Sequence, residues 1–395
     1  MASPSVNSAG NLARVLMLVH TGSATTRAQI TSRTGLTRTA IGNLVAELVD
    51  RRLVADAAPR PGPGTTGRPS HQVRPTSDGP TVIAAELDAD SVTVALVGLG
   101  AEIVAWLCQP LPRHPTPTDA VRAIVDGVQA LLSHHRRPVL AAGIAVASAV
   151  NARNGTALAA LYLDWPQTVP LRHLVGLALA EAGIPLPVVV SNDAHCAALA
   201  EHRHGAGRDA QHLLCLTTGH RGLGGGMVIA GQLYTGRDGS AMEVGHLTVN
   251  PGGHACSCGG QGCLDAEAGP TALVRAAGRT APGQNVEAAA REILAAYATD
   301  PTCRDAVRQV VGVLSGGIAG MINILNPDRV VLGGILGDFL SVDGQSLCQA
   351  TASRSLLCRT ASVPIVRGEL ASAPLLGAAE QAIQPLLDDP RRDLE

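Results

Sequence analysis

Three cysteines within eight residues, preceded by a histidine, constrain the fold of this 395-residue chain more than any other feature. They are Cys256, Cys258 and Cys263, and the histidine is His246. Three thiolates and an imidazole form the closed four-ligand set that a structural zinc ion prefers, and the intervening glycines let a short loop turn around one ion. We predict one structural zinc ion per chain, in a loop over residues 246–265. Reduced bystander thiols are the alternative.

The cysteine content and the hydropathy of the sequence indicate the cellular location of the protein. Nine cysteines are an odd number, and the N-terminus lacks the charged-then-apolar order of a signal peptide, which argues against a secreted disulfide scaffold. No apolar run reaches the roughly 18 residues of a membrane span. We therefore expect a cytoplasmic protein with no membrane segment.

Charge is distributed unevenly along the chain. The segment 1–75 carries nine arginines against three acidic side chains, a net charge of +6, whereas the remainder carries −8. A basic segment joined to an acidic body is typical of a nucleic-acid-binding domain fused to a second domain, although solvated terminal helices would give the same balance. Aromatic residues are only 2% of the chain, which argues against base stacking as the main activity.

Helical patterns dominate the segment 1–56. Apolar residues recur at helical spacing from Leu12 to Val19. Thr26 and Gln29 predict a capping box at the start of a second helix. Thr37 is expected to cap a third helix, after a short turn that contains a glycine. This spacing predicts a helix-turn-helix.

A segment rich in proline and glycine, residues 59–70, follows these helices, and a strand resumes at Val73. This order predicts the wing of a winged helix. We therefore assign residues 1–78 to a winged helix-turn-helix DNA-binding domain, with a small helical dimerisation module as the alternative.

The expected DNA contacts are polar side chains at helix N-termini, on the outer face of the third helix or in the wing. Arginine can bind guanine through two hydrogen bonds and asparagine can bind adenine, threonines at helix N-termini hold phosphates, and a wing arginine can enter a minor groove. The predicted set is Thr26, Thr37, Arg38, Thr39, Asn43 and Arg68.

From residue 79 onward strands alternate with helices, which predicts an α/β body of two lobes over residues 79–395. The expected strands cover residues 81–87, 92–99, 139–146, 186–190, 213–217, 227–229 and 330–332. Asn192 and Asp193 directly follow one of them, and Glu243 and His246 lie further on. Such side chains bind the hydroxyls of a sugar, although each alone could be a helix cap. The glycine-rich segment 219–226 could cradle phosphate or form a tight turn.

Several sequence segments resemble the ROK family (repressor, open reading frame, kinase), and the resemblance covers essentially the whole chain. The segments are Ser191-Asn-Asp-Ala-His195, Glu243-Val-Gly-His246, His254-Ala-Cys-Ser-Cys258-Gly-Gly-Gln-Gly-Cys263-Leu-Asp265, Leu325-Asn-Pro-Asp-Arg-Val-Val-Leu-Gly-Gly334 and Gly377-Ala-Ala-Glu380. The resemblance implies a two-lobed, actin-like sugar kinase fold, to which the repressor branch of the family adds an N-terminal winged helix.

The resemblance also implies roles for individual residues. The zinc ligands would be His246, Cys256, Cys258 and Cys263, and the sugar contacts would be Asn192, Asp193, Glu243, His246 and Asp265. One ring nitrogen of His246 would bind zinc while the other meets a sugar hydroxyl, so the metal would fix the orientation of the ring. Asp193 matches the catalytic base of the kinases.

The departures from the family pattern change the expected function. Family kinases carry an Asp-x-Gly-Gly-Thr phosphate loop, but this chain has Glu86-Leu-Asp88-Ala-Asp90 at that place. Added carboxylates repel a polyphosphate and the glycines are absent, so we expect no kinase activity and a vestigial Asp193. Asp265 replaces the family's longer glutamate, and His195 stands where an asparagine is usual.

The sequence as a whole predicts a transcription regulator that represses carbohydrate-related genes. It would bind double-stranded operator DNA, sense a sugar or sugar derivative, and form a homodimer or homotetramer. An ATP-dependent sugar kinase with an appended DNA-binding domain is the main alternative. A zinc sensor is another, although a closed ligand set favours permanent metal.

Overall fold

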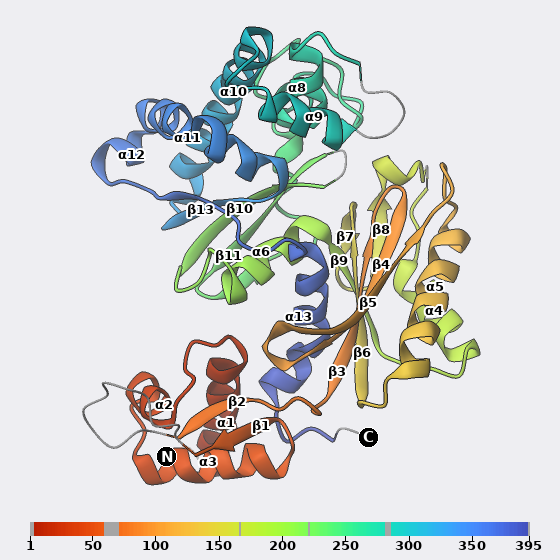
Figure 1. Ribbon diagram of the computed structural model, residues 1–395, viewed down its shortest axis with the longest axis vertical. Coiled ribbons are helices and arrows are strands. Elements are labelled where there is room, and N and C mark those ends of the chain that lie inside the picture. Colours follow the sequence, from red (N-terminus) through yellow and green to blue (C-terminus); the bar gives the residue numbers. More distant parts are fainter. Residues whose placement is uncertain (1–3, 59–70, 166, 220–221, 281–285, 394–395) are drawn as a thin grey trace.

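The computed structural model describes residues 4–58, 71–165, 167–219, 222–280 and 286–393 (Figure 1). Its N-terminal part, which we call the head, has three helices and a two-stranded antiparallel sheet: α1 (Pro4–His20), α2 (Arg27–Thr34), α3 (Arg38–Asp50), β1 (Val54–Ala57) and β2 (Gln72–Pro75). The segment that joins the two strands contains the predicted wing, including Arg68, and residues 59–70 lie outside the described residues.

The predicted helix starts of the head are present. Thr26 is the N-cap of α2 and accepts the N–H of Gln29 at 3.2 Å. The expected capping box is wrong in one detail, because the side-chain oxygen of Gln29 accepts the N–H of Thr25 instead. Thr37 is the N-cap of α3 and accepts the N–H of Ala40 at 3.2 Å.

The first lobe is built on a five-stranded sheet with the order β5-β4-β3-β6-β9. Its strands are β3 (Thr81–Leu87), β4 (Ser91–Gly98), β5 (Glu102–Pro110), β6 (Val139–Val146) and β9 (Val188–Asn192), and a small hairpin adds β7 (Ala149–Asn151) and β8 (Thr156–Ala159). Side chains alternate along β3: Ile83 and Ala85 pack into the core under α4 (Pro117–His134) and α5 (Leu171–Glu181), whereas Val82 and Ala84 face the opposite core.

The second lobe has a sheet of order β12-β11-β10-β13-β14. Its strands are β10 (His212–Thr218), β11 (Leu223–Ile229), β12 (Gln232–Tyr234), β13 (Arg329–Leu332) and β14 (Ile365–Arg367). The helices on its outer face are α7 (Leu264–Ala268), α8 (Pro270–Ala276), α9 (Val286–Ala295), α10 (Pro301–Leu325), α11 (Gly334–Arg354) and α12 (Leu356–Thr360). Two further helices, α6 (Asp193–His204) and α13 (Ala373–Asp388), lie between the two sheets (Figure 1).

Helix α10 is the one helix in the described part of the chain that is long and apolar enough to cross a membrane. Its charged residues fall in the first two turns, and 56% of its most apolar window is buried inside the protein. Its apolar face packs in the core of the second lobe with α8, α9 and α11. We interpret α10 as a core helix.

The glycine-rich segment 219–226 forms the predicted tight turn at its start, where the N–H of Gly219 donates to the carbonyl oxygen of Gly222 at 3.0 Å, and its described remainder continues as a strand and not as a phosphate cradle. Gly224, Gly225 and Gly226 lie inside β11, paired with β10. A Cβ on Gly226 would lie 2.6 Å from the Cβ of Ala198 and 2.8 Å from the carbonyl oxygen of Ala194. Gly224 and Gly226 therefore let α6 approach the sheet closely.

Candidate functional site

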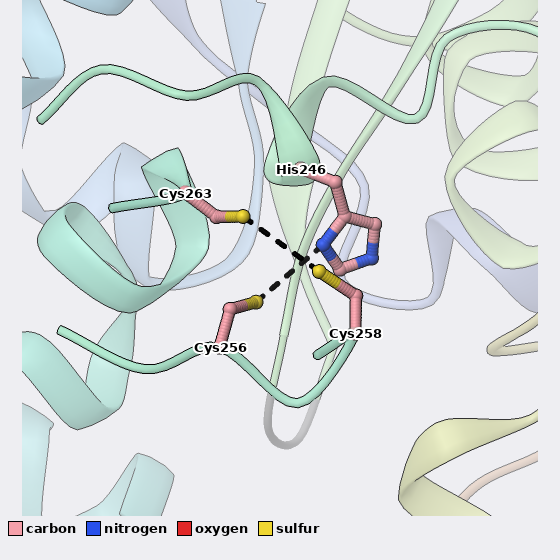
Figure 2. Close-up of side chains that lie close together, drawn as sticks. All are labelled: His246, Cys256, Cys258 and Cys263. Atoms are coloured by element: carbon pink, nitrogen blue, oxygen red, sulfur yellow. Dashed lines mark hydrogen bonds between the residues drawn. The ribbon is translucent and has the colours of Figure 1, made fainter. Parts of the chain in front are cut away.

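The Cys/His cluster is assembled by one loop and two short helical turns (Figure 2). His246 ends a 3₁₀ turn over Val244–His246, Cys256 and Cys258 lie in the loop, and Cys263 is the N-cap of α7. The loop closes at Gly262, which has a φ of 69° and where a Cβ would lie 1.7 Å from a carbonyl oxygen. Only glycine fits there.

The geometry of the cluster fits a tetrahedral metal ion. The four ligating atoms lie within 4.8 Å of one another, with 3.6 Å between the Cys256 sulfur and Nδ1 of His246 and 3.7 Å between the Cys258 and Cys263 sulfurs. Zinc bonds of about 2.3 Å to sulfur and about 2.05 Å to nitrogen would separate these pairs by about 3.6 and about 3.8 Å. The residues present can therefore hold a metal ion, and their donor set is compatible with zinc.

The second constellation surrounds a small cavity of about 70 Å³. Four of its polar side chains come from sequence-predicted positions: Asn192, Asp193, Glu243 and His246. His246 faces the sulfurs with Nδ1, and its other ring nitrogen lies on the far side of the ring (Figure 2). The cavity is smaller than the roughly 300 Å³ of typical ligand pockets, so a sugar would require it to open.

Asp193 is the first residue of α6, and its environment favours the neutral carboxyl. One carboxylate oxygen accepts the N–H of Ala194 at 2.8 Å. Burial, together with the carboxylates of Asp88 and Glu243, raises the pKa of Asp193 to about 7 against the opposing hydrogen bond from Ala194. Burial also raises the pKa of Glu243. The cavity therefore concentrates carboxyl groups that can pair with ligand hydroxyls as acceptors and, when protonated, as donors.

Asn192 and His195 have structural partners of their own. Asn192 caps α6 by accepting the N–H of His195 at 3.0 Å, and its amide donates to the carbonyl of Ser148 at 3.1 Å. The ring of His195 is buried and lies 2.8 Å from the carbonyl oxygen of Ala241. These bonds fix the start of α6 and hence the position of Asp193.

Asp265 does not line the cavity, although the sequence predicts a sugar contact there. One carboxylate oxygen accepts the Tyr162 hydroxyl at 2.7 Å and the other accepts the N–H of Leu223 at 2.9 Å. Burial and the adjacent carboxylate raise the pKa of the Tyr162 phenol, which keeps it a donor. Tyr162 itself lines the cavity and lies over Gly222, where a Cβ would clash with the ring. No sequence motif marks this tyrosine.

A larger cleft of about 530 Å³ opens between the lobes and shares Asp193 with the small cavity. Its first-lobe side carries Glu86 and Asp88, from the segment that departs from the kinase pattern. Its second-lobe side carries Thr217, Thr218 and Gly333. The cleft thus combines a polar second-lobe wall with an acidic first-lobe wall, which opposes the binding of phosphates.

Most of the predicted DNA contacts lie on the surface of the head. Thr37, Arg38, Thr39 and Asn43 are exposed at and after the N-terminus of α3. Thr26 is half-buried at the start of α2.

These features define a class of protein: a two-lobed α/β body with a Cys/His metal-binding loop, joined to an N-terminal helical head. A family model described as the ROK family matches residues 82–384, and the chain belongs to that family. The two-lobed, actin-like fold implied by the sequence is therefore confirmed.

The chain is similar to both enzymes and regulators of the family. A glucokinase from Streptomyces coelicolor is 34% identical over 249 residues, which cover 57% of this chain and 74% of the kinase. A xylose repressor from Caldicellulosiruptor bescii is 27% identical over 379 residues, which cover 92% of this chain and 93% of the repressor. A solved ROK family transcriptional regulator, a homolog of the E. coli MLC protein, has a TM-score of 0.75 at 24% identity and covers 97% of both chains.

Proposed function

We propose that this protein is a DNA-binding transcription regulator that represses carbohydrate-related genes. The observation that carries the proposal is the extent of the similarity to the xylose repressor. It covers 92% of the chain, more than residues 79–395 alone supply, so it reaches into the head as well as the body. The net charge of +6 over the segment 1–75 supports DNA binding by the head. We propose that the protein binds this DNA in the cytoplasm.

The head, within residues 1–78, is the proposed DNA-binding domain. Its exposed Arg38, Thr39 and Asn43 would read base edges in a major groove, while Thr26 and Thr37 would hold phosphates at the N-termini of α2 and α3. Arg68 is proposed to enter the adjacent minor groove. A homodimer or homotetramer would place two such heads on paired half-sites.

The body, residues 79–395, is the proposed sensor. A sugar or sugar derivative would bind in the small cavity, with Asp193, Glu243 and the outer ring nitrogen of His246 as hydroxyl partners. Asn192 would contribute indirectly by capping α6, and Asp265 would do so by accepting the hydrogen bond that positions Tyr162. One structural zinc ion, held by His246 and the three cysteines, would fix the ring that contacts the sugar.

Sugar phosphorylation is the second candidate function. The glucokinase similarity and the threonine-lined wall of the cleft favour it. Asp193 would then be the base that takes the proton of the attacking hydroxyl. The acidic residues Glu86 and Asp88 on the opposite wall speak against it, and we propose that Asp193 is vestigial as a base.

One experiment on the full chain separates these functions. Operator sites are selected from random DNA with purified protein, and the selected site is then titrated with a panel of sugars and sugar phosphates. A reproducible motif released by one sugar class supports the regulator. Failure to select any motif would refute it. ADP release that depends on a sugar from the same panel would instead support the kinase.

A further inference from the structure

The head packs against the body, and the two share a buried polar cluster. His20 ends α1, Glu380 lies in α13, and Arg203 and His204 end α6. The carboxylate of Glu380 lies 3.0 Å from Nε2 of His20, 2.9 Å from Nε2 of His204 and 2.6 Å from the Arg203 guanidinium. His20 and Glu380 are at most 2% exposed. Three segments far apart in the sequence therefore meet at one carboxylate.

Hydrogen bonding fixes the protonation pattern of the cluster. The backbone N–H of Gly100 donates to Nδ1 of His20 at 3.0 Å, so Nδ1 is an acceptor and Nε2 carries the proton donated to Glu380. Burial alone would raise the pKa of Glu380, but its hydrogen bonds with His20 and His204 and the charge of Arg203 hold that pKa well below its ordinary value. Glu380 is thus an ionised acceptor.

His20, His204 and Glu380 are also close enough together to hold a metal ion. Two contacts oppose that interpretation. A histidine that binds metal through Nε2 carries its proton on Nδ1, which would face the N–H of Gly100 donor to donor. The Arg203 guanidinium already occupies the second carboxylate oxygen and would repel a cation. The cluster is better explained as an ion-paired hydrogen-bond network.

Backbone contacts lock the helix that carries Glu380. A Cβ on Gly377 in α13 would lie 1.9 Å from the carbonyl oxygen of Cys196 in α6, and a Cβ on Gly143 in β6 would lie 2.0 Å from the carbonyl oxygen of Ala378. Helix α13 is therefore wedged directly against both α6 and the first sheet (Figure 1). Because α6 and α13 are in direct backbone contact, a shift of α6 would also move α13 and Glu380.

Helix α6 joins the cluster to the small cavity. Asp193 is its first residue and lines the cavity, and His204 is its last residue and contacts Glu380. Eleven helical steps separate them by about 17 Å. A ligand that displaces Asp193 along the helix axis would therefore move the cluster that holds α1.

From this geometry we propose that Glu380 is a positioning residue for the DNA-binding head, and that α6 conveys the state of the cavity to it. The second half of the proposal rests on the proposed regulatory function. The first half does not, because it concerns only how the head is held.

Hydrogen–deuterium exchange on the full chain tests the first half without DNA or ligand. Glu380→Gln and His20→Gln each remove part of the network, and we expect amides of α1 to exchange at least about tenfold faster while those of α10 stay unchanged. Asp209→Asn is the matched control, since Asp209 pairs with Arg33 across the same junction at 3.6 Å but is exposed. Unchanged exchange of α1 in His20→Gln would overturn the proposal even if Glu380→Gln does not fold.

A double-mutant cycle on operator affinity tests the second half. Residues as far apart as Asp193 and Glu380 normally contribute additively. Transmission along α6 predicts that Asp193→Asn combined with Glu380→Gln departs from additivity in Kd by at least about threefold, whereas a purely structural Glu380 predicts additive effects. Additive effects would overturn the transmission. If the wild-type chain binds no selected DNA, the regulatory function fails, while the exchange result still decides whether Glu380 positions the head.

Discussion

Asp193→Asn should change how the free energy of unfolding of the body depends on pH. In the folded protein, burial and the neighbouring carboxylates of Asp88 and Glu243 raise the pKa of Asp193 from an ordinary 3.8 to about 7. The folded state therefore holds this proton more tightly than the unfolded chain does. The stabilising contribution is fully present below about pH 4 and is lost as the pH rises to about 7.

The size of the effect follows from linkage. One proton held by the folded state alone changes the free energy of unfolding by about 1.4 kcal/mol per pH unit, so two units between pH 5 and pH 7 give at most about 2.7 kcal/mol. Asp193 borders the cleft, and screening by water there reduces the expected value to about 1–2 kcal/mol. Asparagine does not titrate. The free energy of unfolding of the variant should therefore rise by about 1–2 kcal/mol relative to that of the wild type between pH 5 and pH 8.

Tryptophan fluorescence can follow the unfolding of the first lobe, whose residues line the cavity around Asp193. Trp106 lies on β5 and Trp165 is buried in the core under α4 and α5, so urea unfolding followed by their fluorescence reports on the first lobe. The quantity of interest is the difference in unfolding free energy between variant and wild type at pH 5 and at pH 8. The same substitution at an exposed position of α4, Asp126→Asn, is the matched control. A difference for Asp193→Asn that does not change between these pH values, within about 0.3 kcal/mol, would refute the reasoning.

The other predictions address DNA, metal and the cavity. Arg38→Ala should weaken operator binding by about 1–3 kcal/mol and relax the preference at one base position, and an unaltered footprint would exclude α3 as the reading helix. Arg68→Ala should weaken binding mainly at sites with a narrow flanking minor groove, as compared across a set of flanking sequences. Cys258→Ser should lose about one zinc ion per chain by metal analysis and lower the melting temperature of the body, whereas wild-type protein prepared without chelators and found free of zinc would contradict the site. Tyr162→Phe should cost about 1.5–3 kcal/mol in urea unfolding, because it strips a buried hydrogen bond from the Asp265 carboxylate; an unchanged midpoint would mean that water replaces the hydroxyl.

Local patterns carried most of the sequence-based prediction of the fold. The strands expected at residues 81–87 and 139–146 are present with the same bounds, because each is a continuous apolar run buried on both faces. Strand β5 was missed because it lies at the edge of its sheet. Its exposed Ile103 and Trp106 break the expected burial pattern. Sequence periodicity cannot distinguish such an edge strand from a loop.

The candidate site was predictable where its residues are close in sequence and not where they are distant. The four members of the Cys/His cluster all fall between positions 246 and 263, so their spacing alone predicted that they meet. Tyr162 and Asp265 are 103 residues apart and meet only because the second lobe folds against the first. The network around Glu380 spans 360 residues and could not be inferred from spacing.

The two walls of the interlobe cleft are compatible with the proposed role of the body as a sensor. The arginines on the second-lobe side, Arg291 and Arg367, are already paired with Glu287 and Asp338 at 2.6 Å, so they do not offset the acidic first-lobe wall. A nucleotide phosphate placed there would face carboxylates at short range in a partly desolvated cleft, where repulsion is much stronger than in water. The sugar-facing end of the same cleft keeps Asp193 at the start of α6, and the far end of α6 touches the network that holds the head. A loss of phosphate affinity would leave the connection between the cavity and α6 intact, and the proposed regulator depends on that connection.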